Sequence, residues 1–357
     1  MIRNLKHIII FIICFWAFSL SAQDPHFSQN QNTNSYLNPA LSGVYEGSMQ
    51  FGVNYRDQWS SVLGTQKFIT GNVNGDLKFK IFGDDYVSVN VNAMFDQAGR
   101  SFYNQALLHL GGSYIKKLSE NYNGGQYLSV GFRAGMGQNS LDWGRLWFDR
   151  QFDRNSESVN TDINNGEPGI GGGRGKTDFY PDMGVGVFWY MITGDNSSVF
   201  AGLSANHLNT PDISLLQSSS TRGQLLYTKW SGQVGAELSL NNTLSVIPNL
   251  MLWVQGPSWQ SVIGSAIQYD GYADDDLSMR LGIMARLANS SESSVIFDSF
   301  ILDVGFEFSK YEIGLSYDIS VSQLSLASKN RGAFEISLIY RKPYETSYRK
   351  QSNFPRL

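Results

Sequence analysis

The sequence predicts an all-β protein that forms a transmembrane outer-membrane β-barrel of about 14 antiparallel strands. Three observations support this prediction: hydrophobicity that alternates with period two, a composition poor in charge, and an N-terminal segment typical of exported proteins. Charged residues are 16% of the chain, whereas soluble domains carry about 25%. The formal net charge of −4 argues against a nucleic-acid-binding protein, which needs a basic surface. Beyond the N-terminal segment, no apolar run reaches the roughly 20 residues of a membrane-spanning helix.

Met1–Ala22 has the features of a secretory signal peptide: a basic start, an apolar stretch over Ile8–Phe18, and small residues before the expected cleavage point. The only cysteine, Cys14, lies in this segment. The exported chain is therefore expected to form no disulfide, so its fold must depend on backbone hydrogen bonds and packing. After residues 1–22 we expect a segment 23–48, a barrel over 49–342 and a periplasmic tail over 343–357.

From residue 49 to residue 342, the chain consists of segments that alternate in hydrophobicity and are separated by turn residues. In one of them, Val87, Val89 and Val91 alternate with Ser88 and Asn90, so the two faces of a strand carry different side chains. Most segments are long enough for the roughly 9–11 residues that cross a bilayer at a tilt. The predicted strands lie near 49–60, 65–78, 86–97, 101–116, 127–140, 178–192, 197–209, 223–240, 242–256, 258–271, 276–289, 295–309, 310–321 and 331–342.

The polar face of these strands is rich in Gly, Ser, Asn and Gln, with scattered charges of both signs. A soluble sandwich would present Lys and Glu there, whereas opposite charges can pair across the polar lumen of a barrel. The charged residues of this face are Arg133, Lys229, Glu237, Arg280, Arg286, Asp303, Glu307, Glu312, Asp318 and Glu335. Aromatic residues near strand ends are expected to form girdles at the membrane interfaces. They are Tyr55, Trp59, Trp189, Tyr190, Trp253, Trp259 and Tyr340.

The connections between predicted strands alternate between long and short. If the first strand runs outward, the exterior connections include 141–177, 210–222 and 322–330. The periplasmic connections then include 193–196, 241 and 272–275, with 117–126 the longest. Outer-membrane barrels have long external loops and short periplasmic turns. We therefore expect a location in the outer membrane, in contact with its lipid, with the loop 141–177 outside the cell.

Several motifs resemble those of the PorP/SprF family of Bacteroidetes outer-membrane proteins. The most specific ones open the mature chain: QDPHFSQ at Gln23–Gln29, YLNPALSG at Tyr36–Gly43 and NYRDQW at Asn54–Trp59. Similar stretches follow at Phe95–Gly99, Pro181–Gly186, Ala201–Ser204, Asn206–Leu208, Gly314–Asp318 and Gly332–Ile336. The resemblance covers essentially the whole mature chain.

The resemblance implies a barrel of the type IX secretion and gliding machinery that anchors secreted proteins or adhesins through their C-terminal sorting domains. Such a barrel would bind its client at the external loops and secretion or gliding components at the periplasmic face. The resemblance implies no catalysis and no cofactor. Two other functions stay open at this point: a channel or transporter for small hydrophobic solutes, and a purely structural barrel.

The segment before the first strand has two open interpretations. It is polar, apart from a short apolar clip formed by Tyr36, Leu37 and Leu41 around the turn at Asn38-Pro39. One interpretation is a periplasmic linker. The other is a plug inside the lumen. A barrel of about eight strands is just filled by its own side chains, so a barrel of 14 strands has additional space inside. The candidate lumen or plug contacts are Tyr36, Asn38, Pro39, Arg56, Arg133, Arg280, Arg286, Glu307 and Asp318.

The loop 141–177 contains the candidate partner-binding site, formed by Trp143, Trp147 and Phe148. Exposed aromatic residues on a loop mark binding surfaces, and Trp is enriched among residues that dominate binding. We expect a client to dock on this loop together with the loop 210–222. The alternative is that the cluster folds over the barrel mouth as a lid or extends the aromatic girdle.

Three further motifs do not support a catalytic or metal site. The run Gly171–Thr177 lacks the first glycine of a phosphate-binding loop, because Ile170 stands in its place. Asp274–Asp276 fall in a predicted turn, where solvated acids are ordinary. The mature histidines are far apart in sequence, and no motif supports a Ser–His pair at His109 or His207.

Overall fold

The computed structural model describes residues 24–343 and 354–356, except 65–67, 100, 122–123, 154–155, 157, 161, 164–174, 195–196, 216–222, 272–276, 290–294 and 323–324. The predicted signal peptide Met1–Ala22 lies outside the described residues. The same holds for Asp274–Asp276, for the glycine-rich run up to residue 174, and for most of the loop 210–222.

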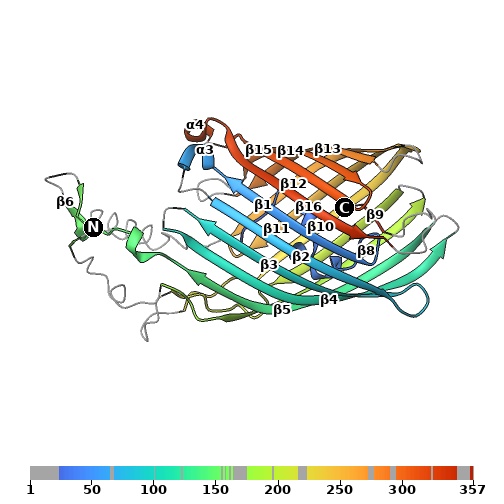
Figure 1. Cartoon of the computed structure of the whole chain (residues 1–357), viewed down its shortest axis with the longest axis horizontal. Helices are drawn as coiled ribbons and strands as arrows, with labels where there is room; N and C mark the ends of the chain where they lie inside the picture. The colour runs from blue at the N-terminus through green and yellow to red at the C-terminus, as the bar shows by residue number, and fades with distance from the viewer. Residues whose placement is uncertain are drawn as a thin grey trace, which may run out of the picture.

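Fourteen strands form a closed antiparallel barrel, which confirms the predicted fold class (Figure 1). Neighbours in sequence pair throughout, except that β5 pairs with β8, and β1 pairs with β16 to close the ring. The barrel strands are β1 (Met49–Gln58), β2 (Phe68–Lys80), β3 (Tyr86–Ala98), β4 (Tyr103–Asn121), β5 (Gly124–Ser140), β8 (Tyr180–Gly194), β9 (Ser197–Asn206), β10 (Lys229–Asn241), β11 (Leu244–Gln255), β12 (Ser258–Asp270), β13 (Leu277–Ala288), β14 (Ile296–Phe308), β15 (Tyr311–Ser320) and β16 (Arg331–Lys342).

The barrel wall is polar on the inside and apolar on the outside. In β3, Ser88 and Asn90 are buried towards the lumen, while Val89 and Val91 are exposed on the outer face. This arrangement follows from the period-two alternation, because successive side chains of a strand point to opposite faces. An apolar outer wall is what a membrane barrel presents to lipid.

Two details of the prediction are wrong. The connection expected at 117–126 is a continuation of the β4–β5 hairpin, which runs to Asn121 and resumes at Gly124. Tyr190 and Trp253, expected in the membrane girdles, are buried. The register explains Tyr190: adjacent residues of a strand face opposite sides, so Trp189 and Tyr190 cannot both face lipid.

The two ends of the barrel differ in their connections. The end that we call the loop end carries 59–67, 99–102, 141–179, 207–228, 256–257, 289–295 and 321–330. The opposite end, the turn end, carries 81–85, 122–123, 195–196, 242–243, 271–276 and 309–310. A small sheet of β6 (Phe152–Asp153) and β7 (Ser158–Val159) stands well away from the barrel, beyond the loop end (Figure 1).

The helices of the described residues are all short. Those of the loop end are α3 (Ser60–Leu63), η4 (Trp143–Arg145), η5 (Asp149–Gln151) and α4 (Ser325–Ser328). The N-terminal segment contains η1 (Asn30–Asn32), α2 (Asn34–Leu37) and η2 (Pro39–Leu41). Within the described ranges, no helix has the length and apolar character needed to cross a membrane.

The N-terminal segment Asp24–Ser48, which we call the plug, lies inside the barrel (Figure 1). Its apolar residues Leu37, Ala40, Leu41 and Val44 pack in one buried cluster with lumen-facing aromatic residues of the wall. Those residues include Tyr127, Phe188, Tyr190 and Phe200. The main hydrophobic core of the described residues is therefore the contact between the plug and the apolar residues that the wall turns inward. A second buried cluster joins Phe27 and Tyr36 of the plug to the wall. The segment Phe354–Arg356 also lies inside the barrel, at its turn end.

Candidate functional site

The plug crosses the lumen from the loop end to the turn end. At the loop end, the backbone N–H of Asp24 donates to Oε1 of Gln255, the last residue of β11, at 2.9 Å. At the turn end, the N–H of Ser48 donates to the carbonyl of Lys342, the last residue of β16, at 2.8 Å. The contact surface between plug and wall decides whether this barrel is filled or open, so we treat it as the candidate functional site.

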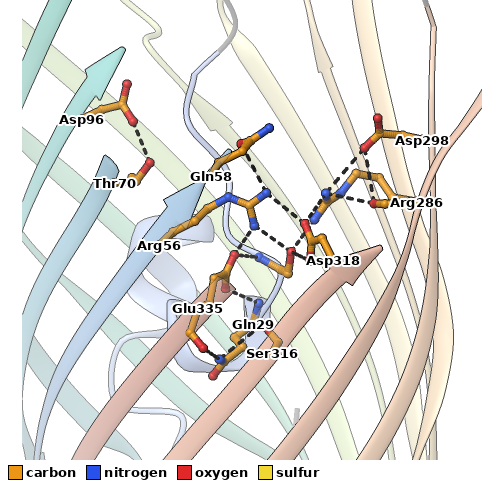
Figure 2. Close-up of polar contacts among 12 residues, drawn as sticks. Gln29, Arg56, Gln58, Thr70, Asp96, Arg286, Asp298, Ser316, Asp318 and Glu335 are labelled. Carbon is orange, nitrogen blue, oxygen red and sulfur yellow. Dashed lines mark hydrogen bonds and ion pairs between the residues drawn. The ribbon is translucent and has the colours of Figure 1, made fainter. Parts of the chain in front are cut away.

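A buried cluster of four charges holds the start of the plug (Figure 2). Arg56 of β1 forms ion pairs with Asp318 of β15, at 2.9 Å, and with Glu335 of β16. Arg286 of β13 lies 2.7 Å from the same carboxylate of Asp318. Two guanidinium groups thus balance two carboxylates, which is the condition for burying them at all.

Ser28 of the plug lies at the centre of this cluster. Its hydroxyl donates to Asp318 Oδ1 at 2.7 Å and accepts from Arg56 Nη1 at 2.8 Å. The backbone N–H groups of Ser28 and Gln29 donate to the two oxygens of Glu335, at 2.5 and 2.9 Å. The plug therefore completes a network whose other members come from four strands around the barrel's closure.

A second cluster fixes the N-terminal end of the plug. His207, just after β9, lies between two carboxylates: its Nε2 is 2.7 Å from Asp24 Oδ2, and its Nδ1 is 2.7 Å from Asp182 Oδ1. The other oxygen of Asp182 is 2.6 Å from Nε2 of His109. Lys229 lies 3.5 Å from Asp24.

The charges of this second cluster stabilise one another. Burial alone would lower the pKa of His207, but Asp24 and Asp182 beside it raise that pKa to about 9. Burial would likewise raise the pKa of Asp24, but His207 and Lys229 hold it well below its usual range. At neutral pH, a protonated His207 therefore joins the ionised end of the plug to the wall.

Glycines of the wall make room for the motif Asn38-Pro39-Ala40. A Cβ added to Gly131 would come within 2.3 Å of Pro39, and one added to Gly186 would come within 1.8 Å of Asn38 Oδ1. The side-chain amide of Asn38 donates to the carbonyls of Val187 and Leu203, each at 3.3 Å. Its Oδ1 accepts from the N–H of Ala40 at 2.9 Å and so caps η2.

The sequence-predicted lumen residues separate into four groups. Arg133 donates to the carbonyl of Tyr36 at 2.8 Å and lies over its ring, 5.7 Å from the centroid. Arg56, Arg286 and Asp318 meet in the charge cluster described above, and Asn38 and Pro39 lie in the plug. Arg280 pairs with Asp303 at 3.2 Å rather than with the plug, and Glu307 pairs with Arg341 at 3.5 Å.

The three predicted partner-binding residues do not form one cluster in the described structure. Trp143 is half-buried, with its ring beside Gly175. Trp147 is 47% exposed and stacks on Phe152, the first residue of β6, with ring centroids 6.2 Å apart. Phe148 is half-buried. The exposed aromatic pair of this loop is therefore Trp147 with Phe152.

Sequence reasoning missed several residues that hold the plug. Asp24, Asp182 and His207 lie in family-like motifs but are absent from the predicted lumen contacts, and no sequence feature assigns His109 to the plug. A signal for Asp182 was present, because it falls on the buried face of β8 in the period-two pattern. Nothing in the sequence could show that His207 lies between Asp24 and Asp182, because these three residues are joined only by the closure of the barrel around the plug.

Two small cavities lie beside the plug among the residues that the structure describes. One cavity next to Asp24, His26 and Lys229 has a volume of about 20 Å³. Another, between Gln31 of the plug and the pair Arg280–Asp303, has a volume of about 30 Å³. Volumes of this size hold one or two water molecules. The arrangement can therefore bind and retain a segment of protein chain, and it leaves these two spaces too small for a larger solute.

Comparison with known proteins gives one family. The sequence model of the type IX secretion system membrane protein PorP/SprF matches residues 19–340 of the chain. No protein with a curated description matches it.

Two solved structures share the fold. The toluene transporter TbuX of Ralstonia pickettii is 13% identical over 88% of this chain and 94% of its own, with a TM-score of 0.51. The toluene transporter TodX of Pseudomonas putida is 11% identical over 92% of this chain and 100% of its own, with a TM-score of 0.51. At these identities the likeness shows the barrel fold alone.

Proposed function

Because the chain belongs to the type IX secretion system membrane protein PorP/SprF family, we propose that this outer-membrane barrel anchors secreted proteins or adhesins by binding their C-terminal sorting domains. The client docks at the loop end, which faces the cell exterior. The turn end faces the periplasm and contacts components of the secretion or gliding machinery.

The observation that carries this proposal is the filled lumen. Ion pairs and hydrogen bonds from many strands hold the plug, and its apolar residues form the core of the protein. A barrel whose own chain occupies its passage is suited to binding at its rim rather than to conducting a solute. The exposed pair Trp147–Phe152 stands beyond the rim on the loop between β5 and β8, where a folded client can reach it.

The alternative function is a channel for small hydrophobic solutes, the class to which toluene belongs. Its support is the shared fold with TbuX and TodX. The path beside the plug, however, is lined by charges and amides such as Arg56, Asp318, Glu335 and Gln29, which apolar solutes do not favour. Client binding is for this reason the function that the geometry favours.

The experiment compares client retention at the cell surface among loop variants. Trp147→Ala removes the exposed half of the aromatic pair, and the triple replacement of Trp143, Trp147 and Phe148 by Ala removes the whole predicted site. Both variants should fold, because the strand ladder closes without the loop. Each buried aromatic anchor contributes about 2 kcal/mol or more to binding, so we expect client retention to fall at least tenfold.

The matched control is Phe82→Ala, which removes an aromatic residue that is 89% exposed at the opposite end of the barrel. It should leave client retention unchanged. Full retention in the triple variant would show that the docking surface lies elsewhere than on this loop. Equal loss in the Phe82 variant would point to a general effect on the barrel.

A further inference from the structure

We propose that the turn end of the lumen is a binding site for a peptide segment with an aromatic residue followed two positions later by a basic one. Its resident ligand is the chain's own C-terminal segment Phe354–Arg356. This inference is independent of client anchoring at the loop end.

The aromatic half of the site encloses the ring of Phe354, which is 7% exposed. Tyr86 of β3 meets this ring edge to face, with centroids 5.5 Å apart, and Tyr190 of β8 lies 6.3 Å from it. The ammonium group of Lys78, on β2, lies 3.4 Å from the centroid of the ring. An aromatic ring that is packed by two tyrosines and faced by a buried lysine side chain lies in a specific pocket rather than in an incidental contact.

Lys78 connects this pocket to the plug. Its ammonium group donates to the carbonyl of Tyr45 and lies 4.6 Å from the centroid of the Tyr45 ring. The same group is 5.4 Å from the ring of Tyr86. One lysine of the wall is therefore surrounded by rings from the plug, the wall and the C-terminal segment, and it connects the plug to that segment.

The basic half of the site is a pair of carboxylates on strands remote from β2. Nη1 of Arg356 lies 2.6 Å from Asp270 Oδ2 and 3.3 Å from Glu237 Oε1. Glu237 is 4% exposed and belongs to β10, while Asp270 ends β12. Two carboxylates that approach one cation so closely repel each other without it, so this half of the site requires a basic group.

The spacing of the two halves suits a short, stiff segment. Phe354 contacts β2, β3 and β8, whereas Arg356 contacts β10 and β12, so the segment reaches across part of the lumen. Pro355 between them fixes one backbone dihedral and reduces the entropy lost on binding. The recognition chemistry is therefore an aromatic side chain for the tyrosine–lysine pocket and a guanidinium or ammonium group for the acid pair.

The test supplies the segment as a separate peptide. A barrel that ends at Pro343 is purified in detergent, and a fluorescently labelled peptide with the sequence of residues 351–357 is titrated against it by anisotropy. We expect saturable binding to the truncated barrel and at least tenfold weaker binding to the full chain, whose site is occupied. Peptides carrying Phe354→Ala or Arg356→Glu should each lose at least tenfold in affinity.

A charge-reversal pair makes the test specific. The Arg356→Glu peptide should regain affinity for a truncated barrel that carries Asp270→Arg.

If the truncated chain fails to fold, the full chain with Phe354→Ala and Arg356→Glu replaces it, because that chain vacates the site and should bind the natural peptide. The matched control is the full chain with Lys310→Glu, an exposed charge at the same end, which should bind the peptide as weakly as the unaltered full chain. The proposal is overturned if the peptide does not saturate the vacant barrel, or if both altered peptides bind as well as the natural one.

Discussion

Replacing Arg56 by Met tests how strongly the charge cluster holds the plug. Met keeps much of the length of the side chain but removes the ion pairs to Asp318 and Glu335 and the hydrogen bond to Ser28. Asp318 retains Arg286 at 2.7 Å, whereas Arg56 is the one cation paired with Glu335 in the described structure. The Glu335 side chain is 3% exposed, so the variant leaves a buried carboxylate without a counter-charge.

Removing one partner of a buried ion pair costs about 3–5 kcal/mol. We therefore expect the free energy of unfolding, measured by urea titration of the purified barrel in detergent, to fall by about that amount. Adding Glu335→Gln to Arg56→Met should recover part of the loss, because the unpaired charge is then absent. Arg145→Met is the control: its pair with Asp142 is half-exposed and should contribute less than about 1 kcal/mol. A loss below about 1 kcal/mol for Arg56→Met would refute the view that this cluster anchors the plug.

Three further predictions follow from the wall, the second cluster and the topology. Gly186→Ala should destabilise the protein by about 1–3 kcal/mol, because the added Cβ would collide with Asn38 of the plug. The control Gly71→Ala, whose Cβ would meet open space, should be tolerated. Equal unfolding midpoints for the two variants would contradict this packing. Because the pKa of His207 is raised from 6.5 to about 9, its stabilisation of roughly 3 kcal/mol is complete below pH 6.5 and is lost as the pH rises through about 9. Urea titrations at pH 6 and pH 10 should show this loss, and His207→Gln should reduce it; the same pH dependence in both proteins would exclude His207 as its source. In whole cells, a membrane-impermeant maleimide should label Ser156→Cys but not Asp84→Cys, and the reverse pattern would invert the proposed orientation.

The barrel was predictable because its strands repeat one local rule many times. The alternation seen at Val87–Asn92 recurs in strand after strand, so an error at one boundary does not affect the fold. The prediction is wrong where a residue is assigned to a girdle by its nearness to a strand end instead of by the alternation. Tyr190 was placed in a girdle because it stands near a strand end, although the parity of β8 directs it into the lumen, where it packs against Phe188.

The plug site was only partly predictable, because its contacts join residues far apart in sequence. Arg56, Arg286 and Asp318 were identified as lumen charges from their place on the polar face. That they meet at Ser28 depends on the register of β1, β13, β15 and β16 around the closed ring. Whether the segment before the first strand is a linker or a plug likewise depends on the volume left inside the barrel. That volume cannot be derived from a local sequence pattern.

The glycines of the strands illustrate the same limit. The stretch Pro181–Gly186 predicts a strand, but the sequence does not show why a glycine is needed at position 186. In the structure, it makes the space into which Asn38 fits. A motif in the wall and a motif in the plug therefore match each other, and this complementarity becomes visible only when both are placed in three dimensions.

The central claim is that the chain's own N-terminal segment fills the lumen, so that this barrel binds protein rather than conducts solutes. The most direct test is the conductance of single barrels in planar lipid bilayers, for the full chain and for a variant lacking residues 24–43. Our account predicts a nearly closed full-length barrel and stable, open conductance steps in the variant, because the wall closes without the plug. An open full-length barrel, or a variant whose conductance stays as low as that of the full chain, would contradict it.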